Sequence, residues 1–302
     1  MKKILGFVTD RTKEFTKYSI YFIKKWVNEI DEFYIYTTRK AYNNFFKNII
    51  DFKHKVIFLD KRYTDHPERW SYQFWEKGLE IAEKYDDNTL IYFTGDGAFL
   101  VNNPFKYVEK YENNFNNYDL IGCIYDRHCY DVGPFFKNSK RSREFLRNFV
   151  KICQNVPNNN LLIYENWNRE RKKLIPISKS LHRNWLCTQN ILWNIYLKNP
   201  NINFLTKVIN VKFFTTEYHK YTGPGSVSGM CSTLYDSFKW NCCLINFRGK
   251  PKYVITPEVY KYYFYNYDNK NIISKKEFMK RFGYQDKKKW KEAIERYNKK
   301  QI

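Results

Sequence analysis

The stretch LIYFTGDGA, residues Leu90–Ala98, joins a short apolar run to an acidic residue that stands between two glycines. An apolar run of this length is typical of a buried strand. Glycines on both sides of Asp96 would let the backbone turn and approach a ligand closely. The stretch therefore predicts a carboxylate at the end of a buried strand. Taken alone, Gly-Asp-Gly is also an ordinary turn sequence.

Strand and helix patterns alternate around this stretch. Helical spacing of apolar residues predicts a helix over residues 15–26 and a second helix that begins at Asp65 or His66, with Pro67 in its first turn. This alternation predicts an α/β fold with a mostly parallel sheet and helices on both faces. The expected strands are Ile4–Val8, Phe33–Tyr36, Val56–Leu59, Leu90–Phe93 and Leu120–Ile124.

Polar residues follow two of these strands directly. Thr9 and Asp10 come after the first strand, and Thr94–Asp96 ends the fourth. Ligands of such sheets bind in a crevice beyond the carboxyl ends of the strands. The sequence therefore predicts that both groups lie at one crevice. A carboxylate there could hold a divalent metal ion that bridges the diphosphate of a nucleotide.

The second half of the chain is less regular. Helical patterns cover residues 141–153 and 186–197, strand patterns cover 208–214 and 244–247, and the polar segment 154–184 is expected to be rich in loops. A basic helical extension is expected over residues 266–302, after a main domain over residues 1–265. In this extension Ser274 and Glu277 have the spacing of a capping box, and Asp286 can cap a second helix.

The charge of the chain points to a polyanionic partner. Its 302 residues carry 53 basic and 31 acidic side chains, a formal net charge of +22. Such a charge attracts nucleic acid or an anionic membrane or glycan. A coding bias toward lysine is the other explanation, but it does not account for the shortage of acidic residues. Aromatic residues make up 20% of the chain, which excludes disorder over most of its length.

Two observations concern the cell compartment. No apolar run approaches the ~18–20 residues that a membrane span needs, and no secretory signal is seen. The seven cysteines follow no disulfide or zinc spacing. We therefore expect a cytoplasmic protein with reduced cysteines, and a peripheral position at a membrane surface is the other location that the charge allows.

Five segments, in chain order, resemble glycosyltransferases of the GT-A fold, which use nucleotide-sugar donors. The chain is most similar to two retaining groups. One contains glycogenin and bacterial lipooligosaccharide galactosyltransferases, and the other contains plant xyloglucan xylosyltransferases and yeast mannan galactosyltransferases. The resemblance covers about residues 1–255 and implies a Rossmann-like GT-A domain. The segments are His66–Trp70, Thr94–Asp96, Asp131–Ser139, Thr188–Leu192 and Asn246–Lys252.

The resemblance implies a donor site at the crevice. Asp96 would face the diphosphate or its metal ion, Gly249 would let the backbone approach the diphosphate, and Lys252 would add positive charge. Ordinary alternatives are a turn for Asp96 and a solvated lysine for Lys252. The donor-binding residues implied are Thr9, Asp10, Arg69, Thr94, Asp96, Asn246, Gly249 and Lys252. Thr9 and Asp10 would contact the base and ribose or simply cap the strand, and Arg69 would brace the end of the acidic strand.

Two further residues have catalytic roles by the same resemblance. Gln189 matches a residue that the families place beside the anomeric carbon, where its amide could stabilise an oxocarbenium-like state. Asp131 follows the fifth expected strand and could orient or deprotonate the acceptor hydroxyl. The alternatives are hydrogen bonding at a helix N-terminus for Gln189 and capping of a helix or turn for Asp131.

The chain departs from the families at the expected metal ligands. Thr94 replaces the first Asp of the Asp-x-Asp motif, and Asn246 replaces the His. One carboxylate with neutral oxygens makes a poor Mn²⁺ or Mg²⁺ site. We expect Asp96 and the donor diphosphate to hold the metal weakly. The second expectation is a reaction without metal, in which Lys252 and Arg248 neutralise the leaving group.

The expected function is therefore glycosyl transfer, with retention, from a UDP-sugar or another nucleotide-sugar donor. The acceptor would be a glycan or lipid-linked glycan, or a hydroxymethylated DNA base flipped out of its duplex. The alternative is a non-catalytic, nucleic-acid-binding protein on a degenerate glycosyltransferase scaffold.

Overall fold

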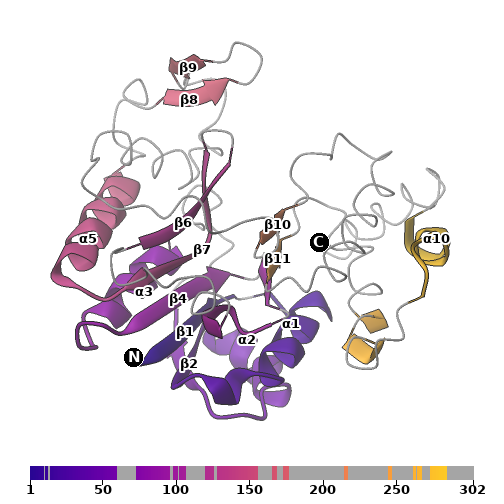
Figure 1. Ribbon diagram of the computed structural model, residues 1–302. Coiled ribbons are helices and arrows are strands. Elements are labelled where there is room, and N and C mark those ends of the chain that lie inside the picture. Colours follow the sequence, from indigo (N-terminus) through magenta and orange to yellow (C-terminus); the bar gives the residue numbers. More distant parts are fainter. Residues whose placement is uncertain are drawn as a thin grey trace. The chain divides into compact units, whose positions relative to one another are not determined.

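A computed structural model of the chain shows two compact units, each built from several chain segments (Figure 1). Unit 1 comprises residues 1–10, 28–96 and 108–209, and unit 2 comprises residues 11–27, 97–107 and 210–302. The structure describes residues 1–9, 11–12, 14–59, 73–95, 98–100, 102–106, 120–125, 128–155, 165–168, 173–176, 214–216, 244–246, 261–262, 264–266 and 273–283.

Unit 1 is built around a six-stranded mixed sheet in the order β3-β2-β1-β4-β7-β6. The strands β3, β2, β1 and β4 are parallel, and β7 runs antiparallel to both β4 and β6. This sheet confirms the predicted α/β fold, and each of the five predicted strands is present. The bounds are β1 (Lys3–Val8), β2 (Glu32–Thr37), β3 (Lys55–Phe58), β4 (Leu90–Gly95), β6 (Leu120–Tyr125) and β7 (His128–Lys137).

The centre of the sheet is packed around Phe93. Gly6 of β1 stands opposite Phe93 of β4, and a Cβ atom on Gly6 would lie 2.2 Å from a carbon of the Phe93 ring. That ring also stacks on Phe136 of β7, with 6.3 Å between ring centroids. Glycine at position 6 therefore provides the space in which Phe93 is seated.

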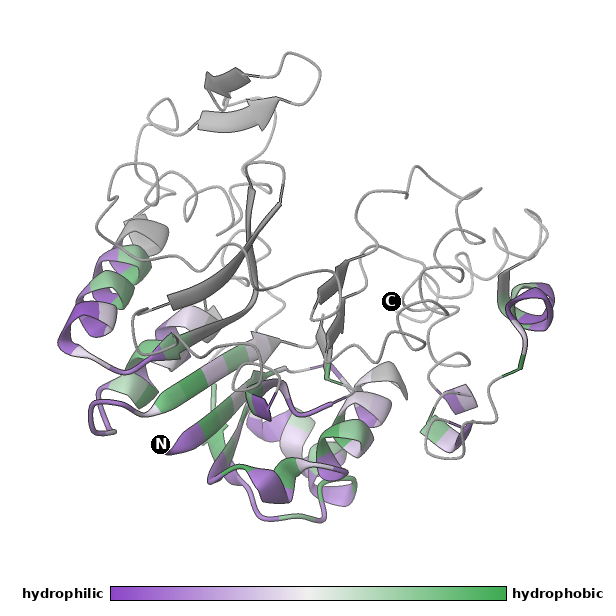
Figure 2. Ribbon diagram, viewed as in Figure 1, coloured by the Kyte–Doolittle hydropathy of each residue, from purple (hydrophilic) through white to green (hydrophobic). Residues whose placement is uncertain are grey.

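The helices α3 (Gln73–Ala82) and α5 (Lys140–Asn155) pack on each other in unit 1. Trp75 and Phe149 join them edge to face, with ring centroids 4.8 Å apart. Gly78 of α3 faces the Phe136 and Phe93 rings, so α3 covers the face of the sheet on which those rings lie. Figure 2 shows α5 banded in green and purple, the alternation of apolar and polar residues typical of an amphipathic helix.

Asn138 connects the end of β7 to the end of α3. Its side chain is fully buried, and its Nδ2 donates to the carbonyl oxygens of Ala82 (2.8 Å) and Tyr85 (2.6 Å). Ser139 then caps α5, because its Oγ accepts a hydrogen bond from Ser142 N (3.0 Å). The segment that resembles a strand followed by a helix start, Asp131–Ser139, is confirmed as such.

Smaller elements complete unit 1. The helix α2 begins after Thr38, whose side chain accepts a hydrogen bond from Ala41 N. Two short strands form a hairpin within the segment that was predicted to be rich in loops. The bounds are α2 (Arg39–Asn44), the 3₁₀ turns η1 (Val27–Glu29, which crosses into unit 2) and η2 (Phe46–Asn48), β8 (Glu165–Asn168) and β9 (Lys173–Pro176).

Unit 2 holds a three-stranded sheet in the order β10-β11-β5. Trp26, just after the helix α1, donates its indole N–H to Leu100 O of β5 (3.4 Å). Phe264 packs against α1 through rings that include Phe22, with centroids 5.4 Å apart. The bounds are α1 (Glu14–Lys24), β5 (Ala98–Leu100), β10 (Phe214–Thr216), β11 (Leu244–Asn246), α10 (Lys275–Phe278) and the π-helical turn η8 (Met279–Gly283).

The capping box predicted in the extension is confirmed in part. Ser274 caps α10, and its Oγ accepts a hydrogen bond from Glu277 N (3.3 Å). Across the predicted domain boundary at residue 265, the Tyr262 ring packs against Phe278 and Phe282. The boundary itself stays a prediction. The predicted helices at 186–197 and after Asp286, most of the expected strand 208–214, and the helix start near Asp65 lie outside the described residues.

Candidate functional site

The strand order of unit 1 reverses at β1. After β1 the chain moves outward through β2 and β3, and it then returns to the other side of β1 to form β4 (Figure 1). In open α/β sheets such a reversal leaves a crevice at the carboxyl ends of the two strands, where ligands bind. The structure therefore brings together the two strand ends that the sequence predicted to share a crevice.

The register fixes which residues meet there. In the parallel pairing of β1 with β4, Phe7 stands opposite Thr94 and Val8 stands opposite Gly95. The next residues along the two strands are Thr9 and Asp96. Asp96 lies outside the described residues. The described register ends with Val8 opposite Gly95, the residues that precede Thr9 and Asp96 in the sequence.

Thr9 is held by the sheet. Its side chain is fully buried, and its N–H donates to Tyr36 O of β2 (2.9 Å), which extends the β1–β2 ladder by one residue. This geometry agrees with the strand-end alternative for Thr9, and a contact with the base and ribose stays a prediction. Asp10, the following residue, lies outside the described residues.

Two more threonines lie near this edge. Thr94 is fully buried in β4, and Thr37, the last residue of β2, is also fully buried. Among the described residues, the hydroxyl of Thr37 has no hydrogen-bond partner. Thr37 follows the apolar run Phe33–Tyr36 in the sequence as Thr9 follows Ile4–Val8, so its position at a strand end is the signal by which it could have been found.

The donor set does not fit a resident divalent cation. Thr94 offers a neutral hydroxyl that is buried in the sheet, and Asn246 offers a neutral amide. Asp96 is thus the single carboxylate among the three positions that resemble metal ligands. Within the described part of the chain, no group of three or more His, Cys, Asp or Glu residues could hold a metal ion. Hard cations favour several oxygen ligands that include more than one negative charge, and these three positions supply one.

Asn246 is positioned by unit 2. It ends β11, which pairs antiparallel with β5, so that Asn246 stands opposite Ala98. On its other side β11 pairs parallel with β10, and Asn246 stands opposite Thr216. Ala98 is the second residue after Asp96 in the sequence. The strand that opens the Asn246–Lys252 motif is therefore hydrogen-bonded to the strand that follows the acidic stretch.

Asp131 lies in the strand β7, in agreement with the resemblance of Asp131–Ser139 to a strand followed by a helix start. It also follows β6, the fifth expected strand, and its proposed role stays a prediction. Its neighbour Tyr130 pairs with Cys123 of β6. Pairing with β6 extends β7 toward its amino end beyond Asp131, as far as His128.

The remaining predicted site residues lie outside the described residues, and their roles stay predictions. They are Asp10, Arg69, Asp96, Gln189, Gly249 and Lys252.

A cluster of charges lies at the opposite end of the strands. Glu32, the first residue of β2, pairs with Lys2 (2.7 Å) and with Lys55. The Glu32 carboxylate also accepts a hydrogen bond from the Tyr85 hydroxyl. The Tyr34 hydroxyl belongs to the same cluster, because it forms a hydrogen bond with the Tyr85 hydroxyl. Partial burial raises the pKa of Glu32, but hydrogen bonds from Lys2, Lys55, Tyr85 and Tyr34 outweigh it and lower the pKa to about 2. This cluster closes the amino edge of the sheet, away from the crevice.

Comparisons with known proteins give matches among solved structures. No protein-family model matches the chain, and no curated protein matches it. Mouse xyloside xylosyltransferase 1 in its apo form is 8% identical, with a TM-score of 0.47, and the match covers 82% of this chain and 98% of that one. A glycosyltransferase involved in the glycosylation of the major capsid of PBCV-1 is 8% identical, with a TM-score of 0.48 and coverage of 88% and 99%.

The galactosyltransferase LgtC, in complex with donor and acceptor sugar analogues, is 10% identical, with a TM-score of 0.45 and coverage of 90% of this chain and 97% of that one. All three similar structures are of glycosyltransferases, the class that the sequence motifs resemble.

Proposed function

We propose that the chain transfers a sugar from a nucleotide-sugar donor to an acceptor hydroxyl. The observation that carries this proposal is the reversal of strand order between β1 and β4, with the stretch LIYFTGDGA at the end of β4. That position is where an open α/β sheet binds its ligand. The five motif segments that resemble GT-A glycosyltransferases support the choice of ligand.

In the proposed reaction the bond between the anomeric carbon and the donor diphosphate breaks. A bond to the acceptor oxygen forms, and the acceptor proton passes to a base. We infer that Asp96 orients the diphosphate and that Gln189 lies beside the anomeric carbon. Asp131 is the proposed base, since a carboxylate can deprotonate an acceptor hydroxyl in the transition state. We propose retention of configuration, following the groups that the motifs resemble.

The diphosphate leaves with negative charge, which must be neutralised. Because the donor set does not fit a resident divalent ion, we propose that cationic side chains supply this neutralisation, with Lys252 and Arg248 as the candidates. A divalent ion would then be held weakly and would be dispensable. The sequence favoured a weakly held metal ion over a reaction without metal. We place the reaction without metal first, because the Thr94 side chain is buried.

A donor screen tests the proposal. Nucleotide release would be measured with UDP- and GDP-sugars, each with Mn²⁺ and with a chelator, and UDP binding would be measured by titration calorimetry. We expect one donor to be hydrolysed slowly without an acceptor, and chelation to leave part of the rate. Absence of nucleotide binding under both conditions would overturn the proposal.

The second candidate is a non-catalytic protein that binds nucleic acid. It is favoured by the neutral residues Thr94 and Asn246 at positions where the families carry metal ligands. The two candidates differ in one result. Binding of DNA that weakens with salt, without binding of any nucleotide sugar, would support the second candidate.

A further inference from the structure

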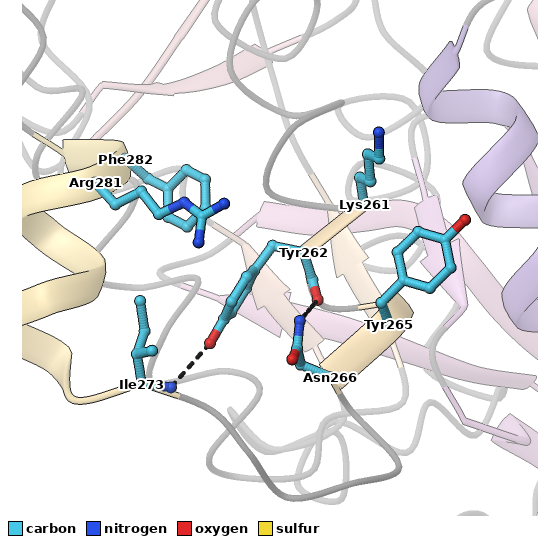
Figure 3. Close-up of a pocket in the computed structure, with 7 residues that line it drawn as sticks. All are labelled: Lys261, Tyr262, Tyr265, Asn266, Ile273, Arg281 and Phe282. Atoms are coloured by element: carbon cyan, nitrogen blue, oxygen red, sulfur yellow. Dashed lines mark hydrogen bonds between the residues drawn. The ribbon is translucent and has the colours of Figure 1, made fainter.

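A pocket of about 530 Å³ lies in unit 2, between the segment 261–266 and the segment 273–282 (Figure 3). Its walls carry the rings of Tyr262, Tyr265 and Phe282 and the cationic side chains of Lys261 and Arg281. This volume falls within the ~300–1,000 Å³ of pockets that hold small organic groups. The sequence motifs and the proposed sugar transfer do not use any of these residues.

The two walls of the pocket are fixed to each other. The hydroxyl of Tyr262 accepts a hydrogen bond from Ile273 N (2.8 Å), and Tyr262 O accepts one from Asn266 Nδ2 (2.7 Å), as Figure 3 shows. The Tyr262 ring also packs against Phe282, with centroids 5.5 Å apart, and against Phe278. The hydrogen bond from Ile273 and the ring contacts therefore hold Tyr262, in the segment 261–266, against the segment 273–282.

Arg281 is oriented by the same rings. Its guanidinium carbon lies 5.4 Å from the centre of the Tyr262 ring and 5.1 Å from that of Phe282. A guanidinium that stacks on aromatic faces keeps its N–H edge available for an anion. Neither Arg281 nor Lys261 forms an ion pair with a carboxylate of the described residues. Both side chains are exposed.

Tyr265 presents a ring to solvent on the same side of the segment 261–266 as Lys261 (Figure 3). The residue is 62% exposed. Its ring meets Phe264 edge to face, with centroids 5.3 Å apart, and Phe264 in turn packs against Tyr21 and Phe22 of α1. Packed aromatic side chains therefore hold the exposed Tyr265 ring in place. A fixed aromatic ring in solvent is the platform on which a nucleobase stacks.

The positive charge continues beyond the pocket. Lys275, Lys276 and Lys280 are exposed along α10 and η8, where Glu277 is the one acidic residue within 273–283. A ligand with a single phosphate would engage the two cations of the pocket and leave these lysines unused. A chain of phosphates would engage them all, which favours a polyanion that also carries bases.

We propose that this pocket binds one nucleotide of a single-stranded nucleic acid. The base stacks on Tyr265, the phosphates on either side contact Arg281 and Lys261, and the lysines of α10 and η8 follow the strand. The site does not depend on the proposed sugar transfer. It would serve a transferase that acts on nucleic acid, and equally a chain without activity.

Fluorescence polarisation of the full chain with a labelled strand of about ten thymidines tests the site. We expect Tyr265→Ala to weaken binding about tenfold, since stacking of one base contributes ~1–3 kcal/mol, and Tyr265→Phe to bind as the wild type does. Arg281→Ala should weaken binding about fivefold and reduce the slope of log affinity against log salt by about one. Both side chains are exposed, so circular dichroism should report an unchanged fold.

Arg39→Ala is the matched control. Arg39 is exposed and lies over the Phe58 ring at 4.3 Å, so it is a ring-stacked arginine outside the pocket. It should leave binding within about twofold. Wild-type affinity in both pocket variants would overturn the proposal. Equal binding of an abasic strand of the same charge would also overturn it, because the site would then recognise anions without a base. A third contradicting result would be binding of phosphatidylserine vesicles that depends on the pocket residues while binding of the thymidine strand does not.

Discussion

Asn246 stands opposite Ala98 in the antiparallel ladder between β11 and β5. The pairing places the first residue of the Asn246–Lys252 motif beside the strand that follows Asp96 in the sequence. Two segments far apart along the chain are thus joined by main-chain hydrogen bonds within unit 2.

The close contact between Gly6 and the Phe93 ring predicts that substitution of Gly6 strongly lowers stability. A Cβ atom at this position would lie 2.2 Å from the Phe93 ring, and that ring is itself fixed against Phe136. We expect Gly6→Ala to lower the free energy of unfolding by about 2–4 kcal/mol, because overpacking forces the ring and the sheet to shift. Urea denaturation followed by fluorescence measures this change.

Gly78→Ala is the control for that experiment. Its Cβ atom would lie 3.1 Å from the Phe136 ring, a contact that a small shift relieves. Alanine also stabilises a helix interior by about 1 kcal/mol over glycine, so we expect a net change within about 1 kcal/mol of zero. Equal destabilisation by the two substitutions would show that the Phe93 ring does not depend on Gly6.

Asn138 predicts a second stability effect. Its buried amide donates to carbonyl oxygens at the end of α3, and its Oδ1 accepts a hydrogen bond from Arg143 (3.0 Å). Asn138→Ala should lower the free energy of unfolding by about 2–4 kcal/mol, because these buried groups lose their partners. The exposed Asn43 in α2 is the matched control, and Asn43→Ala should change it by less than about 0.5 kcal/mol. Similar results for the two would contradict the structural role of Asn138.

Glu32 predicts how stability depends on pH. Its pKa of about 2 in the folded state lies below its ordinary value of 4.5, so the folded state binds fewer protons than the unfolded state over this range. The stabilisation by Glu32 is therefore fully present above pH 4.5 and is lost as pH falls toward 2. In Glu32→Gln we expect a lower melting temperature at neutral pH and a weaker loss of stability between pH 4.5 and 2.

The control for Glu32 is Glu83→Gln. Glu83 pairs with Arg147 (2.9 Å) where both side chains are largely exposed. Solvent screens such a pair, so the variant should melt as the wild type does at each pH. A wild-type acid profile in Glu32→Gln would show that the cluster at the amino edge does not set the acid stability of the sheet.

The sequence predicted the parts of the fold that depend on local pattern. The apolar runs predicted strands at the positions of β1 to β4 and of β6, of which β1, β2 and β4 are buried in the structure. The edge shared by Thr9 and Thr94 follows from parallel pairing. The strand β5 was missed, because the three residues that follow Gly97 are too few to show a periodic pattern of apolar side chains. The first residues of β7, His128–Tyr130, were missed because their pairing with β6 is a tertiary effect.

In the candidate site, too, features that depend on contacts between distant segments could not be predicted from the sequence. The position of Asn246 beside Ala98 depends on a pairing between distant segments, which residue spacing does not show. The pocket of unit 2 depends on the hydrogen bond from Ile273 to Tyr262 and on the exposure of Tyr265, which are properties of the folded chain. The burial of Thr94 is also a property of the folded chain, because the sequence gives the residue type but not its exposure.

The most direct test of the account is donor hydrolysis by Asp96→Ala beside Asp87→Ala. Asp87 is an acidic residue near the start of β4, with a side chain 60% exposed and paired with Arg143, far along the strand from the crevice. We predict that Asp96→Ala abolishes nucleotide release while the protein stays folded, and that Asp87→Ala retains it. Unchanged turnover in Asp96→Ala would contradict the proposed site and the sugar transfer assigned to it.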